Sequence, residues 1–312
     1  MTSEVLYRKY RPQKFGEVLD QDHIVSVLEK AIKLGNIAHA YLFTGSRGTG
    51  KTTIARILAR AVGTSPNDLY EMDAASNRGI DDVRELREAV HTLPFESKYK
   101  VYIIDEAHML TKEAFNALLK TLEEPPAHVI FILATTELEK LPETIISRCQ
   151  VFQFKKPSQS RLAEMSITIA KKEGFSLEKS SAELIALLGD GSFRDTQSIL
   201  QKVLSSSKDK KIDPDEVTLA VGAPPLRLVN EVISALNGKD LAAALKTLES
   251  ISDGSDPKVF LKMLLHTLRQ VLLLRHAPLL AASFKEEVSA EQFKFLESVS
   301  TTKGSGISSA TL

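Results

Sequence analysis

Residues Gly45–Thr52, which read GSRGTGKT, have the types and spacing of a loop that binds phosphate. They match the pattern G-x-x-x-x-G-K-[ST], in which the glycines let several backbone N–H groups point at one phosphate. Lys51 would neutralise the β- and γ-phosphates of a nucleotide, and the Thr52 hydroxyl would ligate Mg2+. The loop therefore predicts a nucleoside triphosphate site.

A second motif places two carboxylates at the end of an apolar run. Val101–Ile104 is followed directly by Asp105 and Glu106. Because ligands of doubly wound sheets bind at the carboxyl ends of the strands, Asp105 would face the Mg2+ ion. Glu106 is placed to orient or deprotonate the water that attacks the γ-phosphate. Asp105–His108 spells the acidic box of one helicase group, but such helicases need a second ATPase-like domain and residues 158–312 look all-helical. We predict His108 to be a structural loop histidine and not a catalyst.

Short apolar runs that alternate with helical patterns would position these motifs. The expected strands are Ala40–Thr44, Leu69–Met72, Val101–Ile104, Val129–Ala134 and Cys149–Phe154, and the expected helices between them are Lys51–Val62, Ile80–Thr92 and Lys112–Leu122. Strands buried on both faces and separated by helices predict a parallel sheet with helices on both sides. The phosphate loop then lies between a strand and a helix, as its mechanism requires.

After Pro157 the strand pattern ends and helical patterns follow. They cover Gln159–Glu173, Ser181–Leu188, Arg194–Leu204, Asp213–Val221, Leu226–Leu236, Asp240–Ser250 and Pro257–Arg275. Gly222–Pro225 has the composition of a linker. We therefore predict three parts: an α/β nucleotide-binding domain over 1–157, a helical domain over 158–221 and a second helical domain over 222–312.

The composition narrows the class of protein. The chain has 312 residues, of which 43% are hydrophobic and 26% charged, and its 40 basic residues balance its 40 acidic ones. These values exclude a disordered chain and a collagen. The single cysteine, Cys149, excludes an internal disulfide and a four-cysteine metal site, and it fits a reducing, cytoplasmic compartment. The sequence shows neither a signal peptide nor an apolar run long enough to span a membrane.

Further segments occur in the order found in the gamma/tau subunits of bacterial DNA polymerase III, which the chain resembles. They are Tyr7–Pro12, His39–Phe43, Asp73–Ser76, Asn116–Pro126, Ala134–Thr136, Ser147–Cys149 and Gly191–Asp195. The resemblance implies an AAA+ ATPase domain, a helical lid, and a helical collar through which subunits form homo- or hetero-oligomers. It also implies ATP and Mg2+ as ligands, with other clamp-loader subunits, the sliding clamp and primer–template DNA as partners.

The resemblance assigns further residue roles. Thr135 or Thr136 would be sensor 1, Arg194 would be sensor 2 in the lid, and Arg148 would be the arginine finger that reaches a neighbour's ATP. Cys149 would be a small buried residue after the finger. Residues Tyr7–Pro12 would border the adenine and ribose. The predicted nucleotide-binding set is Tyr7, Arg11, Pro12, Gly45, Ser46, Arg47, Gly48, Thr49, Gly50, Lys51, Thr52, Thr53 and Arg194.

The family encircles DNA and contacts its backbone without sequence preference. Ser76, Asn77 and Arg78 precede the helix expected at Ile80–Thr92, where a phosphate could bind; simple N-capping by Ser76 or Asn77 is the alternative. Lys112 and Lys120 are weaker candidates for DNA contact. Basic residues outnumber acidic ones in residues 1–60, and we assign that excess to nucleotide and subunit contacts.

Two features depart from the family pattern. Only Gly63–Leu69, without cysteine, stands where the family has a four-cysteine zinc module, so we predict no zinc and a module that is absent or was removed. The collar region ends early, in the Gly/Ser/Thr-rich segment Thr301–Leu312, which we expect to be mobile. This ending suggests a truncated or naturally short form. Because the collar supports the pentamer in the family, we expect a shortened collar to form a stable pentamer less readily.

The predicted function is that of an ATP-hydrolysing motor subunit, which opens the sliding clamp and loads it onto primed DNA. A different AAA+ motor, such as a branch-migration ATPase, is one alternative, although that family carries a winged-helix domain where this chain has amphipathic helices. A non-hydrolysing structural clamp-loader subunit is the other alternative. The intact Lys51, Thr52, Asp105 and Glu106 argue against it.

Overall fold

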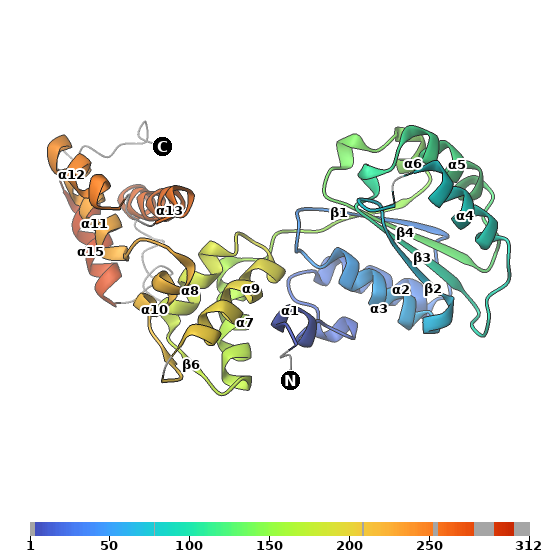
Figure 1. Cartoon of the computed structure of the whole chain (residues 1–312), viewed down its shortest axis with the longest axis horizontal. Coiled ribbons are helices and arrows are strands. Elements are labelled where there is room, and N and C mark those ends of the chain that lie inside the picture. The colour runs from blue at the N-terminus through green and yellow to red at the C-terminus, as the bar shows by residue number, and fades with distance from the viewer. Residues whose placement is uncertain (1–3, 78, 208, 252–254, 278–289, 303–312) are drawn as a thin grey trace. The chain divides into compact units, whose positions relative to one another are not determined.

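A computed structural model of the chain describes residues 4–77, 79–207, 209–251, 255–277 and 290–302 (Figure 1). Contacts within the chain divide it into two units. One is Tyr10–Pro157, and the other joins the residues up to Lys9 with those from Ser158 onward. The residues before Tyr10 thus group with the helical part. The predicted boundary between 221 and 222 stays a prediction.

The unit Tyr10–Pro157 contains a five-stranded parallel sheet in the order β2-β3-β4-β1-β5 (Figure 1). The register pairs Thr44 with Thr135 and Asp73 with Asp105, so the carboxyl ends of four strands meet at one edge. All five predicted strands are confirmed. Their bounds are β1 Ala40–Thr44, β2 Leu69–Asp73, β3 Lys100–Asp105, β4 Val129–Thr135 and β5 Gln150–Gln153.

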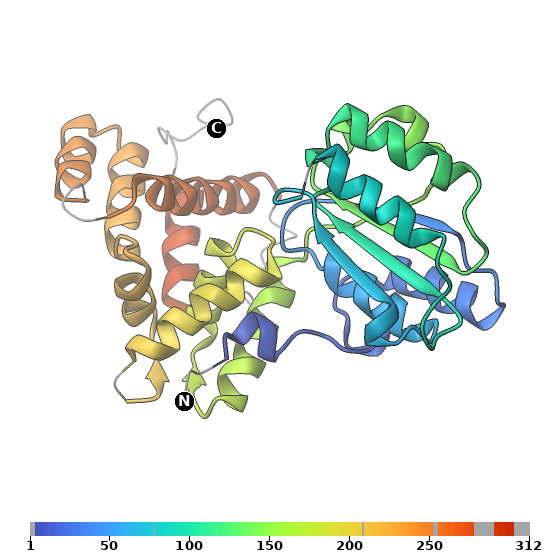
Figure 2. The same cartoon turned by 45° about the vertical axis from the view of Figure 1, so that its right-hand side comes forward.

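Helices cover both faces of this sheet because the central strands are apolar on both sides. Leu42 and Leu133 pack into one core, under α4, α5 and α6, whereas their neighbours Phe43 and Ile132 pack into a second core, under α2 and α3. Figure 2 shows the two helical layers. The helices are α2 Asp22–Lys33, α3 Lys51–Ala61, α4 Ile80–Val90, α5 Lys112–Glu123 and α6 Glu143–Ile146, with 3-10 turns η1 Phe15–Glu17, η2 Pro66–Asp68, η3 Ala107–Met109 and η4 Leu138–Lys140.

The other unit is mainly helical, as expected. Its elements are α1 Leu6–Lys9, α7 Gln159–Lys172, β6 Ser176–Leu177, α8 Lys179–Leu188, α9 Phe193–Ser206, β7 Lys211–Ile212, α10 Pro214–Val221, α11 Leu226–Asn237, α12 Leu241–Ile251, α13 Pro257–His276 and α15 Ala290–Thr301. Side-chain caps begin several of these helices; the Ser158, Ser192 and Asp213 side chains accept amide hydrogen bonds in the first turn. The two-residue strands β6 and β7 pair in parallel, a small departure from an all-helical prediction.

Two further helices in this unit, α1 and α15, have no counterpart in the sequence prediction. The Leu6 amide of α1 donates to Gln201 on α9 at 3.0 Å, and Lys9 forms an ion pair with Glu173 at 2.6 Å. Packing against the helical unit therefore stabilises a segment too short to form a helix alone. Most of Thr301–Leu312 lies outside the described residues. The expectation that this segment is mobile therefore stays a prediction.

Among the described helices, none alone has both the length and the apolar character needed to cross a membrane. The helices α10 and α11 meet that test only when taken together, and they are bent by 94°.

Candidate nucleotide-binding site

The predicted phosphate loop connects β1 to α3, and its glycines adopt conformations that other residues rarely tolerate. Gly45 has a φ of 147°, and a Cβ atom there would lie 2.7 Å from the carbonyl oxygen of Phe154. Gly50, at φ 103°, is the N-cap of α3 and offers no side chain to the amides of the first helical turn. Those amides thus lack a side-chain cap, which leaves them suited to an anion.

Lys51 lies inside this loop. Its side chain is buried, and Nζ donates to the carbonyl oxygens of Gly45 at 2.7 Å and Ser46 at 3.0 Å. Burial lowers the pKa of Lys51, and the negative charges of Glu106 and Asp105 oppose that shift. The ammonium group is therefore desolvated and held by neutral carbonyl groups, so a phosphate would be a stronger partner for it.

The remaining loop residues differ in exposure. Thr49 is buried and donates from Oγ1 to the Ser46 carbonyl at 2.9 Å, which braces the turn. Arg47 is exposed, and Thr53 is partly buried in the first turn of α3. The amide of Gly45 donates to the Thr135 carbonyl at 3.3 Å, which links the loop to β4.

The second motif meets the loop through one short hydrogen bond. The Thr52 hydroxyl donates to Oδ2 of Asp105 at 2.6 Å, across 53 positions of sequence. A hydroxyl and a carboxylate in contact are the oxygen donors that Mg2+ prefers, so these two residues fit the metal expected there. Glu106 follows at φ 49°, a left-handed conformation that is uncommon for a residue with a side chain. As a result, Asp105 contacts Thr52 of the phosphate loop, whereas Glu106 contacts Thr136 after β4.

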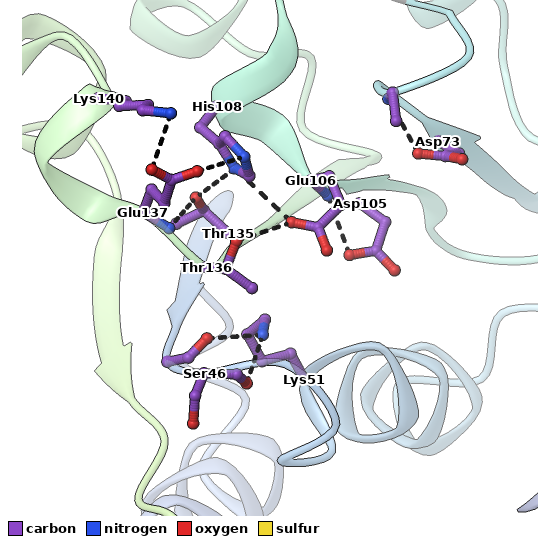
Figure 3. A network of polar contacts seen from close by, with 12 residues as sticks. Ser46, Lys51, Asp73, Asp105, Glu106, His108, Thr135, Thr136, Glu137 and Lys140 are labelled. Carbon is purple, nitrogen blue, oxygen red and sulfur yellow. Dashed lines mark hydrogen bonds and ion pairs between the residues drawn. The ribbon is translucent and has the colours of Figure 1, made fainter. Parts of the chain in front are cut away.

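Glu106 is in contact with the end of β4 (Figure 3). Its Oε2 accepts a hydrogen bond from Thr136 Oγ1 at 3.2 Å. Thr135 is fully buried; its hydroxyl accepts from the Glu137 amide and contacts His108, each at 3.0 Å. The two candidates for sensor 1 therefore have different partners, and Thr136 is the one that contacts Glu106.

His108 and Glu137 also belong to this network; the sequence predicted His108 to be only a structural loop residue and did not single out Glu137. The His108 side chain is 6% exposed and lies between Glu106 and Glu137, with Nε2 3.2 Å from Glu137 Oε1 (Figure 3). Lys140 in turn bonds Glu137 at 2.8 Å. The place of His108 three residues after Asp105 was the available signal, whereas nothing local marked Glu137.

Arg148 follows α6 and bonds to residues of α5 and α6. It forms an ion pair with Glu123 through Nη2, and Nη1 donates to the Thr144 carbonyl at 2.7 Å. Its side chain is 33% exposed. Burial raises the pKa of the neighbouring Cys149 thiol to about 12, as expected for a packed residue rather than a nucleophile.

The predicted lid residue Arg194 lies in the first turn of α9 in the helical unit. Its guanidinium carbon lies 5.0 Å from the centre of the Tyr7 ring, which is a cation–π contact. Two residues assigned to the nucleotide from separate sequence segments are thus in direct contact. Arg11 and Pro12, assigned with Tyr7, belong to the other unit.

The predicted DNA-contacting residues follow β2. The Ser76 hydroxyl donates to Asp73 Oδ2 at 3.3 Å, and the Asn77 side-chain amide donates to the Asp73 carbonyl at 3.2 Å. Both side chains are exposed. Arg78 lies outside the described residues, and a role for Ser76 and Asn77 in binding DNA stays a prediction.

The segment Gly63–Leu69 connects α3 to β2 through η2. It is the segment that stands where the family pattern has a zinc module. Its Asp68 side chain is buried and accepts amide hydrogen bonds from Phe95 at 2.5 Å, Glu96 at 3.1 Å and Ser97 at 2.8 Å. This carboxylate ties the connection to the loop before β3. The expected absence of zinc continues to rest on the sequence.

Comparisons with known proteins agree with the resemblance in sequence. A family model described as DNA polymerase III, delta subunit matches residues 63–158. The DNA polymerase III subunit tau of Bacillus subtilis is 40% identical, over 95% of this chain and 56% of its own length. The gamma/tau subunit of Mycobacterium tuberculosis H37Rv is 40% identical, over 88% of this chain and 51% of its own. The chain thus spans about half the length of these relatives.

A solved structure and a shorter relative complete the comparison. The Holliday junction branch migration motor RuvB of Thermotoga maritima has a TM-score of 0.58 at 20% identity, covering 97% of this chain and 96% of that one, which shows a shared AAA+ fold. The DNA polymerase III subunit gamma of Buchnera aphidicola is 39% identical, over 81% of this chain and 74% of its own length. Because this identity extends over most of both proteins, the chain belongs to the gamma/tau subunit family of DNA polymerase III.

Proposed function

We propose that this chain binds and hydrolyses ATP with Mg2+, as the motor subunit of a clamp loader that opens the sliding clamp and loads it onto primed DNA. The hydrogen bond of 2.6 Å between Thr52 and Asp105 carries the proposal. It joins the phosphate loop to the acidic strand, as a P-loop ATPase requires. A phosphate loop used only as a turn would not need a carboxylate beside its threonine.

In this proposal each part of the site has one task. The loop amides and Lys51 bind the phosphates, and Thr52 and Asp105 hold Mg2+. Bound Mg2+ neutralises charge on the β- and γ-phosphate oxygens. Glu106 orients the attacking water and accepts its proton, while the Thr136 hydroxyl holds the carboxylate in place.

Hydrolysis would need contributions from outside the loop. Arg148 acts in trans on a neighbouring subunit's ATP, where its charge stabilises the transition state. Arg194, supported by Tyr7, couples bound nucleotide to residues 158–221, which act as the lid. Arg148 must first exchange its bonds with Glu123 and Thr144 for the phosphate.

Residues 222–312 form the collar in this proposal. Side chains of α11, α13 and α15 share one hydrophobic core. Leucines spaced four apart remain exposed on two helices, Leu241 and Leu245 on α12 and Leu261 and Leu265 on α13. Such stripes support association with other clamp-loader subunits in the cytoplasm. Primer–template DNA is the remaining partner, with Ser76 and Asn77 as candidate backbone contacts.

Calorimetric titration with ATP and Mg2+ tests the nucleotide site. We expect Lys51→Ala to weaken binding about 10- to 100-fold, since a charge-assisted hydrogen bond contributes about 1.5–3 kcal/mol. Lys98→Ala is the matched control, because Lys98 is an exposed lysine in the same unit and should bind ATP as the wild type does. Equal affinity of the Lys51→Ala and wild-type chains would refute the site.

Reconstitution with the partner subunits tests the assigned role. The wild-type chain should support ATP-dependent clamp loading, and Arg148→Ala should slow hydrolysis by ~10^3-fold. Full loading by Lys51→Ala would instead favour a non-hydrolysing subunit. Movement of a four-way DNA junction by the chain, without clamp loading, would favour the branch-migration alternative.

A further inference from the structure

His108 is a buried histidine enclosed by residues of the candidate site. It lies in η3, directly after the β3 carboxylates, and its side chain is only 6% exposed. Nδ1 is 3.0 Å from the Thr135 hydroxyl and 3.6 Å from Glu106 Oε2, while Nε2 is 3.2 Å from Glu137 Oε1 (Figure 3). The ring therefore contacts β4, the loop after it and the proposed general base.

The two partners of the His108 ring favour one position for its proton. The bond from Lys140 lowers the pKa of Glu137, so this group is a carboxylate and can only accept. The Glu137 carboxylate 3.2 Å from Nε2 therefore favours a proton on that nitrogen, and Nδ1 of a neutral ring then accepts from the Thr135 hydroxyl. The Thr135 oxygen in turn accepts the Glu137 amide at 3.0 Å, which closes the network.

The side chain of Glu106 is partly exposed, so its rotamer depends on contacts with neighbouring side chains. Its side chain is 33% exposed, and its backbone adopts the left-handed conformation that starts η3. Thr136 donates to Oε2 at 3.2 Å, and the His108 ring packs beside the same oxygen, with Nδ1 3.6 Å away and no hydrogen bond between them. A general base must stay within hydrogen-bond reach of its water. Restricting the Glu106 rotamer should therefore raise the rate of hydrolysis.

We propose that His108 is a positioning residue for ATP hydrolysis: it holds Thr135 through a hydrogen bond and limits the room available to the Glu106 side chain by packing beside it, with its own ring oriented by Glu137. The inference rests on the proposed function and extends it. His108 does not act as a base here, because both of its nitrogens are engaged by protein groups. Its contribution is to the rate of hydrolysis and not to the affinity for nucleotide, because Lys51, Thr52 and the loop have other partners.

Three substitutions at this position separate positioning from simple packing. His108→Asn places an amide near the position of Nδ1 and can still reach Thr135. His108→Gln places an amide near Nε2 and can reach Glu137 only. His108→Ala removes both contacts. As a control, His128→Ala changes a partly buried histidine of the same unit that bonds the carbonyls of Val90 and Thr92.

The assay measures kcat for ATP in the reconstituted complex and the ATP dissociation constant of each chain. We expect His108→Ala to lower kcat about 10- to 100-fold with less than about a threefold change in affinity, because small misplacements of a catalytic group have effects of this size. His108→Asn should recover more activity than His108→Gln, and His128→Ala should keep its activity. An unchanged kcat in His108→Ala, parallel loss of rate and affinity, or equal recovery by Gln and Asn would overturn the inference.

Nitrogen-15 NMR of histidine-labelled chain tests the contact without nucleotide. At a pH where histidine is neutral, the His108 resonances, identified by their loss in His108→Asn, should show the tautomer protonated at Nε2. The tautomer protonated at Nδ1 would overturn the network. Failure of the wild-type chain to bind ATP would refute the proposed function, and it would leave this measurement standing as a separate test.

Discussion

The ion pair between Arg148 and Glu123 predicts that an isolated chain restrains Arg148, the proposed arginine finger. The guanidinium group bonds Glu123 at the end of α5 and the carbonyl of Thr144, and the side chains of Arg148 and Glu123 are 33% and 47% exposed. Ion pairs this exposed contribute about 0.2–1 kcal/mol. Glu123→Gln removes that competition, so the finger should be available to a neighbouring ATP about 1.4- to 5-fold more often.

Steady-state ATP hydrolysis by the reconstituted complex, with clamp and primed DNA, measures this effect. Glu124→Gln is the matched control, because Glu124 is the adjacent exposed glutamate and has the same charge. The difference between the two variants should shrink as salt is raised, since screening weakens exposed ion pairs. Equal rates of hydrolysis for both variants, or a lower rate for Glu123→Gln, would refute the idea that Glu123 restrains Arg148.

Two other predictions concern stability and the proposed lid. Burial alone would raise the pKa of Asp68, but the amide hydrogen bonds outweigh it and hold the pKa well below its ordinary value of 3.8. Its stabilisation is therefore present above about pH 4 and is lost as the pH falls further, so Asp68→Asn should cost about 1–3 kcal/mol at pH 7 and flatten the acid limb of denaturation curves. A parallel acid limb in both proteins would contradict this. For the proposed lid, Tyr7→Leu should weaken ATP binding by removing the cation–π contact with Arg194, whereas Tyr7→Phe should retain it. Titration calorimetry would count against the contact if both variants bound alike.

Much of the fold was predictable because its signals are local. The central strands are buried on both faces, so they appear as continuous apolar runs, and the predicted bounds of β1 agree with the structure at both ends. The edge strand β2 is partly exposed and has a weaker signal. The helix α1 was not predictable, because four residues become helical only through their packing on α9.

The candidate site divides in the same way. The sequence by itself determined the residues of the phosphate loop and of the acidic strand, because their chemistry depends on residue type and on spacing along a few positions of backbone. Only the tertiary structure decided which side chains meet. The contacts of Thr52 with Asp105, of Glu106 with Thr136 and of Arg148 with Glu123 each join separate elements, at separations of 53, 30 and 25 positions. Such contacts depend on strand order, register and rotamers, which are set when the whole core packs. For the same reason the sequence alone predicts His108 to be an ordinary loop residue, because its contact with Thr135 depends on the position of β4.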